Sequence, residues 1–284
     1  MAFVITLYAR EGIVMASDSR LTLNTEQQKG EKQVVQFAVG VSDSNDRIFL
    51  LPNHIGLSTY GAADIQGVPI GVYIESFITE HLSGTDTGVD QVAVRVLEYF
   101  RQFDPPPATQ FHVAGYKKEA DGLEDAPSSG DEEEDDIPKV FRQIELPPDT
   151  HFDVAGHRAE SGPKNQHIWH IDVAQNGISR LNASQQPGVS WGGEADILAR
   201  LIQPVAIPGS KGAIKQVLPH FPIPWQFFTL QDAIDFCIFA VRTTIDALRF
   251  QTRPKTVGGP IDVLVIKPNR AWWIQRKILH GQHE

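Results

Sequence analysis

Residues 2–20, AFVITLYAREGIVMASDSR, predict two strands joined by a tight turn at residues 10–12. Both strands are apolar at successive positions, which is typical of central strands that are covered on both faces. If the turn is centred on residues 10 and 11, antiparallel pairing places residue 2 opposite residue 19. We therefore expect the first residues to lie at the open end of this hairpin, beside the polar run that follows the second strand.

Asp18 and Arg20 are the charged residues of that polar run. A carboxylate at the end of a buried strand is costly unless it is paired or hydrogen-bonded. One interpretation is a strand-end ion pair between Asp18 and Arg20 that holds the open end of the hairpin closed. The alternative is a functional site built around residue 2, which the hairpin would hold beside Asp18.

The composition is typical of a soluble globular protein, with 41% hydrophobic and 9% aromatic residues among 284. The sequence has no apolar run of about 18 residues that would predict a membrane span, and no stretch resembling a signal peptide. The single cysteine, Cys237, excludes an internal disulfide and fits a reducing compartment. We therefore expect a cytoplasmic protein in which Cys237 is a buried structural thiol.

The net charge of −10 arises in one segment, residues 118–137. This segment holds ten of the 35 acidic residues and one of the 25 basic ones, so the rest of the chain is nearly neutral. Its composition predicts a solvated, disordered insertion and argues against nucleic-acid binding. A second irregular segment, residues 204–228, contains five prolines and is expected to be a packed loop, with an interface or lid as the alternative. Residues 1–284 are otherwise expected to form a single domain.

Periodicity along the chain predicts the remaining elements. Strands are expected at residues 33–41, 47–51, 54–60, 111–116, 139–146, 167–172, 177–181, 261–267 and 270–277. Helices are expected at residues 65–82, 92–103, 194–201 and 229–250, with Asp90 and Thr229 as N-caps, and residues 21–32 are expected to be a loop. Helices placed between groups of antiparallel strands predict an α+β fold, a four-layer α/β/β/α sandwich of two antiparallel sheets.

Several motifs occur in an order that resembles the β-type subunits of proteasomes, which belong to the N-terminal nucleophile (Ntn) hydrolase superfamily. They are GIVMASDSR (12–20), RIFLL (47–51), GLSTYGAAD (56–64), FHVAGY (111–116), IDVAQNGISRL (171–181), WGGEAD (191–196), TLQDAIDFCIFAVRTTIDAL (229–248) and GGPIDVLVI (258–266). The ordered set covers most of the chain outside residues 118–165 and 204–226. The resemblance implies the Ntn hydrolase fold, a homo-oligomeric ring and a peptide or protein ligand.

In that family the hydroxyl of an N-terminal threonine attacks a peptide carbonyl, and its own α-amino group serves as the base. The α-amino group is suited to this role because its ordinary pKa is about 7.7–8.0. An aspartate and a lysine tune the site, and a backbone amide before the first helix stabilises the oxyanion.

Carried onto this chain, the resemblance assigns the following positions. The nucleophile falls on Ala2, the aspartate on Asp18, the lysine on Arg47, and the oxyanion turn on Tyr60 and Gly61. Supporting residues would be Ser19 and Arg20, and the pocket would include Leu21, Ser58 and Ala62. The family's later serine falls at Trp191 or Gly192, and its later aspartate falls near Arg253 or Pro254.

Several of these positions depart from the family, including Tyr60, which replaces the first glycine of the oxyanion turn. Ala2 has no hydroxyl, and the guanidinium of Arg47 does not lose its proton in proteins. The favoured hypothesis is therefore a proteasome-like subunit that has lost peptidase activity and acts in assembly, binding or regulation. One alternative is a threonine-type peptidase or amidase whose nucleophile is replaced by Ala2. The other is a divergent Ntn-fold hydrolase that uses another group, such as Ser58 or the amine of Ala2.

The histidines offer little support for a metal site. His151, His157, His167 and His170 lie close together in the sequence with Asp172, but no spacing matches a zinc pattern. His167 and His170 would point to opposite faces of one strand. The chain also lacks the glycine-rich loops that bind nucleotide phosphates. We therefore expect no metal and no cofactor.

Overall fold

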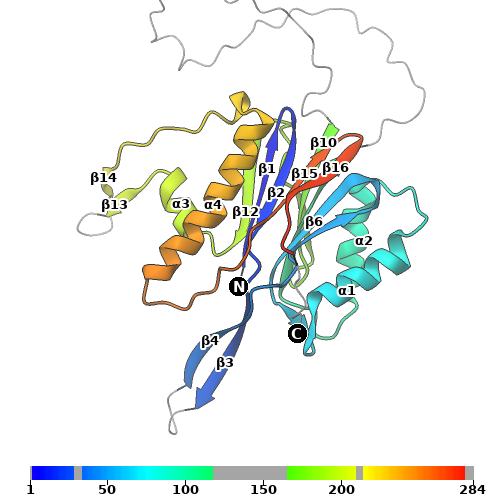
Figure 1. Ribbon diagram of the computed structural model, residues 1–284, viewed down its shortest axis with the longest axis horizontal. Helices are drawn as coiled ribbons and strands as arrows, with labels where there is room; N and C mark the ends of the chain where they lie inside the picture. Colours follow the sequence, from blue (N-terminus) through cyan, green and yellow to red (C-terminus); the bar gives the residue numbers. More distant parts are fainter. Residues whose placement is uncertain (1, 29–33, 118–164, 209–213, 279–284) are drawn as a thin grey trace, which may run out of the picture. The chain divides into compact units, whose positions relative to one another are not determined.

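The computed structural model describes residues 2–28, 34–117, 165–208 and 214–278 (Figure 1). All described residues belong to one compact unit. The predicted acidic insertion at 118–137 and the predicted strand at 139–146 lie outside the described residues.

The first sheet contains the opening hairpin at its centre and has the strand order β12-β1-β2-β15-β16, with every pair antiparallel. Its strands are β1 (Phe3–Ala9), β2 (Gly12–Ser17), β12 (Gly188–Gly193), β15 (Asp262–Lys267) and β16 (Arg270–Gln275). Val4 pairs with Ser17 and Ala9 with Gly12, so the predicted register of the hairpin is confirmed. Every residue of β1 and β2 is buried, as the continuous apolar runs predict.

The second sheet has the order β11-β10-β9-β6-β5 and is also antiparallel. Its strands are β5 (Ile48–Leu51), β6 (Ile55–Gly61), β9 (Thr109–Tyr116), β10 (Gln166–Asp172) and β11 (Gly177–Arg180). A short 3₁₀ helix, Pro52–His54, connects β5 to β6, so the hairpin predicted around Pro52 and Asn53 is confirmed. The predicted hairpin of β10 and β11 is confirmed as well.

Each sheet carries helices on one face. The helices are α1 (Ile70–Phe77) with a π-helical extension (Ile78–Leu82), α2 (Val89–Arg101), α3 (Asp196–Ile202) and α4 (Leu230–Phe250). One apolar core joins α1 and α2 to the second sheet, and another joins α3 and α4 to the first (Figure 1). Thr229 caps α4 in a capping box with Asp232, as predicted.

A third apolar core contains side chains from both sheets. Met15 and Leu264 of the first sheet pack there with Ile48, Ala114 and Ile168 of the second. The three cores therefore join four layers in the order helices, sheet, sheet, helices. The prediction of a mixed α+β fold built from antiparallel sheets and covered by helices is confirmed at this level.

Some predicted element boundaries are wrong. Residues 21–32 were expected to be a loop, but β3 (Leu21–Gln28) pairs with β4 (Val34–Ser42) because strand pairing outweighs polar composition. The helix expected from residue 65 starts at residue 70. Before it, β7 (Asp64–Ile65) and β8 (Val68–Pro69) form a tight hairpin in which Gly67 has a φ of 82°.

Two other expectations near helix ends are also corrected. The N-cap of α2 is Gly88, and the carboxylate of Asp90 instead accepts a hydrogen bond from Trp169 Nε1 at 2.9 Å. Helix α3 begins at Asp196, not at residue 194. The irregular segment 204–228 contains β13 (Ala206–Pro208), β14 (Ile214–Val217) and a 3₁₀ helix at Trp225–Phe227.

Candidate functional site

Asp18 follows β2 and is completely buried. Its Oδ1 accepts a hydrogen bond from the backbone N–H of Phe3 at 3.0 Å. Its Oδ2 accepts from the N–H groups of Gly258 and Arg20, at 3.0 and 3.2 Å. Three separate parts of the chain therefore converge on one carboxylate at the open end of the hairpin. This satisfies the hydrogen-bonding demand that the sequence predicts for a buried strand-end carboxylate.

Arg47 lies directly before β5 and provides the positive charge that faces Asp18. Arg47 Nε is 3.3 Å from Asp18 Oδ1, and the Arg47 side chain is only 3% exposed. Its Nη2 also donates to the carbonyl oxygen of Arg20. Burial raises the pKa of Asp18, whereas Arg47 and the three backbone donors act to lower it. Burial likewise lowers the pKa of Arg47, and Asp18 opposes that shift.

The predicted side-chain ion pair between Asp18 and Arg20 is wrong. The guanidinium of Arg20 instead binds Asp43 in a bidentate manner, with distances of 2.6 and 2.8 Å. Arg20 extends over Gly258, where an added Cβ would lie 2.4 Å from the guanidinium carbon. The arginine can therefore reach the exposed Asp43 carboxylate, while Asp18 is left to Arg47 and the backbone.

Ala2, at the position assigned to the nucleophile, is fully buried. It packs with Val4 and Tyr60, and its carbonyl oxygen accepts a hydrogen bond from the N–H of Glu194 at 2.7 Å. Gly193 lies so close that an added Cβ would be 1.8 Å from this carbonyl oxygen. The structure thus brings residue 2 beside the end of β12, a contact that sequence reasoning missed because it did not predict β12.

Tyr60, at the first position of the predicted oxyanion turn, points into the space between the two sheets. Its ring meets His112 edge-on at 5.4 Å and stacks on His170 at 6.4 Å between centroids. On the other side it covers Gly192, where an added Cβ would lie 2.2 Å from the ring. Burial raises the pKa of Tyr60, so the phenol stays neutral. A large neutral side chain therefore occupies the interior beside Ala2.

The predicted oxyanion turn has a definite backbone geometry. Gly61 has a φ of 97°, and an added Cβ would lie 2.5 Å from the carbonyl oxygen of Ala108. Glycine is required there for both reasons. The N–H of Ala62 donates to the same Ala108 oxygen at 2.9 Å, so that amide is already used in the fold.

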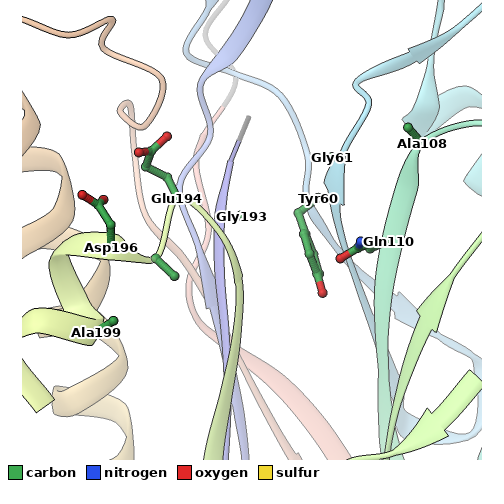
Figure 2. A pocket seen from close by; sticks show the side chains of 9 residues that line it. Tyr60, Gly61, Ala108, Gln110, Gly193, Glu194, Asp196 and Ala199 are labelled. Atoms are coloured by element: carbon green, nitrogen blue, oxygen red, sulfur yellow. The ribbon is translucent and has the colours of Figure 1, made fainter. Parts of the chain in front are cut away.

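A cavity of about 530 Å³ opens beside these residues. Its lining consists of Tyr60, Gly61, Ala108, Gln110, Gly193, Glu194, Ala195, Asp196 and Ala199. Figure 2 shows Tyr60 and Gln110 on one side of this space and Glu194 and Asp196 on the other. Leu21, Ser58 and Ala62, the residues predicted to line a pocket, are not part of the lining.

Arg253 binds both acids on the acidic side of the cavity. Its Nη1 is 2.7 Å from Glu194 Oε1, and its Nη2 is 2.9 Å from Asp196 Oδ1. Thr256 Oγ1 donates to the second Glu194 oxygen at 3.0 Å. The hydrogen bond from Arg253 holds the pKa of Asp196 below its usual value. An arginine thus performs a structural role near the position that the resemblance assigns to an aspartate.

Other hydroxyl groups near the site are buried. Ser17, Ser19 and Ser58 are completely buried, and their hydroxyls have no hydrogen-bond partner within the described residues. Thr6 Oγ1 lies 3.2 Å from His112 Nδ1, and Ser190 Oγ lies 3.5 Å from its Nε2. Burial lowers the pKa of His112 to about 3, so this imidazole is neutral. These groups form a polar interior between the sheets and do not line the cavity.

The histidines do not converge on a common point. His167 Nδ1 lies 2.5 Å from Asp90 Oδ1, whereas His170 Nε2 lies 3.4 Å from Gln110 Oε1, so the predicted opposite orientation of the two rings is confirmed. In the described ranges, no group of three or more His, Cys, Asp or Glu residues is arranged to hold a metal ion. His151 and His157 lie outside those ranges. None of the described helices combines the length and apolar character needed to cross a bilayer.

No protein-family model matches the chain, and no protein with a curated description matches it. The chemistry therefore has to be judged from the site itself. The site contains a buried carboxylate–guanidinium pair, an alanine at the position that the resemblance assigns to the nucleophile, and a cavity whose two acids share one arginine. Such an arrangement can hold the fold together and can bind a ligand, but it offers no exposed nucleophile among these residues.

Proposed function

We propose that this chain is a proteasome-like subunit of the Ntn hydrolase superfamily that has lost peptidase activity and acts through assembly, binding or regulation. The resemblance of its ordered motifs to proteasome β-type subunits suggests the superfamily. The antiparallel sheets with helices on their outer faces are compatible with such a fold.

The observation that carries the proposal is the buried pair of Asp18 and Arg47 beside Ala2. In the related hydrolases, the aspartate and lysine adjust the protonation of a nucleophilic threonine. A guanidinium keeps its proton at any physiological pH and therefore does not accept one during catalysis. Ala2 in turn has no oxygen that could attack a carbonyl. Both changes affect the same step, the activation of the nucleophile.

Two further contacts support the loss of activity. Tyr60 adds a large ring beside Ala2, where the family has glycine in the oxyanion turn. Arg253 binds Glu194 and Asp196, so the loop that follows α4 is engaged in a structural ion-pair network. The adjacent cavity remains available for a peptide or protein ligand.

The test is to restore the nucleophile. The Ala2→Thr variant is produced with a cleavable leader that ends immediately before residue 2, so that the threonine has a free amine. Hydrolysis of a panel of fluorogenic peptides is measured, together with covalent labelling by a peptide electrophile that is read by intact mass. Ala2→Val, prepared in the same way, provides a control of the same shape without a hydroxyl. We expect no turnover above the Ala2→Val control.

Two outcomes would contradict the proposal. Turnover by Ala2→Thr would identify a threonine-type peptidase whose nucleophile is replaced in this chain. Labelling of the unmodified chain by the electrophile would identify a divergent hydrolase that uses another nucleophile. Mapping the labelled residue by mass spectrometry would then show whether Ser58 or the amine of Ala2 reacts.

We also propose that copies of the chain assemble into a homo-oligomeric ring, as the resemblance suggests. Light scattering coupled to size exclusion measures this directly on the full chain. A mass several times that of one chain would support the ring. A monomer at micromolar concentration would contradict it, independently of the result for peptidase activity.

A further inference from the structure

Strand β16 forms one edge of the first sheet. It pairs with β15, and no strand in the described part of the chain pairs with its outer side. The backbone N–H and C=O groups along the outer side of an edge strand are available to another extended chain. Strand β16 is six residues long, whereas the edge strands of the second sheet, β5 and β11, have four residues each.

This edge is positively charged in a chain that is nearly neutral outside residues 118–137. Residues 263–278 contain four basic residues and no acidic residue, although the whole chain has a net charge of −10. Lys277 is used internally, because it is buried and binds Asp46 and Asp262. Arg270 and Arg276 are exposed, and no carboxylate within the described residues forms an ion pair with either of them.

Both arginines are ordered by stacking on tryptophan rings. The guanidinium carbon of Arg270 is 4.5 Å from the centre of the Trp272 ring, and that of Arg276 is 4.9 Å from the centre of Trp273. Stacking uses the face of the guanidinium and leaves the N–H groups in its plane free to donate. A carboxylate that binds such an arginine therefore meets a donor that is already oriented, which lowers the entropy lost on binding.

We propose that the outer edge of β16 binds an extended acidic polypeptide segment as an added β-strand. Backbone hydrogen bonds along residues 270–273, the part of β16 before its pairing with β15 shifts register, would hold the segment. Acidic side chains would pair with Arg270 on one face of the sheet and with Arg276 on the other, because Trp272 packs in the core on the helix side and Trp273 in the core between the sheets. This surface is separate from the cavity beside Ala2, and the inference does not depend on the proposed loss of peptidase activity.

A single-stranded nucleic acid is the other polyanion that arginine and tryptophan side chains can bind. The polypeptide is favoured because an edge strand offers a row of backbone donors and acceptors that matches another strand. The net charge of −10, most of which lies in residues 118–137, also disfavours a nucleic acid with its regularly spaced phosphates.

The test measures fluorescence anisotropy with the full chain and a labelled synthetic peptide of Glu and Val, in which two adjacent Glu residues near each end present a carboxylate to each face of the strand. The Arg270→Gln/Arg276→Gln double variant removes both charges. Arg249→Gln is the matched control, because Arg249 is also exposed and stacks on an aromatic ring, Phe250, but lies on α4. We expect saturable binding that weakens by at least about tenfold in the double variant and is unchanged in the control.

Two modified peptides separate strand addition from simple charge attraction. One has Gln in place of Glu, and the other keeps every Glu but carries N-methyl groups on the alternate amides that would face β16. We expect both to bind more weakly than the parent peptide. The inference is overturned if the Glu–Val peptide does not bind, or if the N-methylated peptide binds as well as the parent. It is also overturned if labelled oligothymidine binds more tightly than the peptide in a manner that depends on the two arginines.

Discussion

Asp18 and Arg47 form a buried ion pair at the open end of the β1–β2 hairpin, with 3.3 Å between Asp18 Oδ1 and Arg47 Nε. The two side chains are 0% and 3% exposed, so neither charge is compensated by bulk water. The pair is stable because three backbone N–H groups also bind the carboxylate. The polar contacts that would surround a catalytic residue 2 thus serve to join β1, β2 and the loop before β15.

Removing one partner of this pair should be strongly destabilising. In Arg47→Met, the Asp18 carboxylate stays buried without its counter-charge, and we expect the free energy of unfolding to fall by about 3–5 kcal/mol. Urea denaturation followed by circular dichroism measures this change. Arg20→Met is the control, because its pair with Asp43 is exposed and should contribute at most about 1 kcal/mol. Equal losses in the two variants would show that the buried pair stabilises the fold no more than the exposed pair does.

The contact between Gly193 and Ala2 predicts that alanine is less tolerated at Gly193 than at Gly67. Gly193 and Gly67 both have a φ of 82°, so alanine is strained at either position by about 1–2 kcal/mol. An added Cβ at Gly193 would also collide with the Ala2 carbonyl oxygen, whereas nothing lies within 4 Å of an added Cβ at Gly67. We therefore expect Gly193→Ala to lose clearly more stability than Gly67→Ala in the same denaturation assay. Similar losses would mean that Ala2 can move aside freely.

Tyr60 should stabilise the fold through the packing of its ring and not through its hydroxyl. Tyr60→Ala removes a buried ring that packs against Ala2, Val4 and His112, and we expect a loss of about 3–5 kcal/mol. Tyr60→Phe keeps the ring and should stay within about 1 kcal/mol of the parent chain. Thermal unfolding of the two variants checks this prediction. A large loss in Tyr60→Phe would instead assign the phenol a structural hydrogen bond.

The opening hairpin could be predicted from sequence because its information is local. Two continuous apolar runs separated by a short turn fix both the strands and their register, and they predict the buried position of Asp18. The need of this carboxylate for partners was also predictable. Local patterns could not identify the partner, because Asp43 and Arg47 are distant in sequence from residues 18–20; only the resemblance placed Arg47 at the same site as Asp18.

Strand β12 was missed for a different reason. Its sequence, GVSWGG, contains three glycines and has weak strand propensity. It becomes a strand because it pairs with β1, and the paired residues are 180 to 190 positions apart in the sequence. The cavity beside Ala2 depends on this pairing, since Gly193, Glu194 and Asp196 line it. The ion pair of Glu194 with Arg253, 59 residues apart, could not be predicted from local patterns either.

The neutral imidazole of His112 should make stability depend on pH. Burial, with a smaller contribution from His170, lowers the pKa of His112 from 6.5 to about 3 in the folded chain. Between these two values the unfolded chain binds a proton at this residue and the folded chain does not, so stability falls as the pH falls below 6.5. Above pH 6.5 the imidazole is neutral in both the folded and the unfolded chain, so His112 does not lower the stability there. Between pH 7.5 and 5, this one group should cost about 2 kcal/mol of unfolding free energy.

Replacing His112 should remove that part of the pH dependence. In His112→Gln the side chain remains polar and does not titrate, so we expect the difference in unfolding free energy between pH 7.5 and 5 to shrink by about 2 kcal/mol. Urea denaturation at the two pH values measures the difference. His54→Asn is the control, because His54 is exposed and asparagine tolerates its φ of 58°. The opposite outcome is that both His112→Gln and the control keep the pH dependence of the parent chain. His112 would then accept a proton in the folded state as readily as in the unfolded one. The polar interior between the sheets would in that case be open to water.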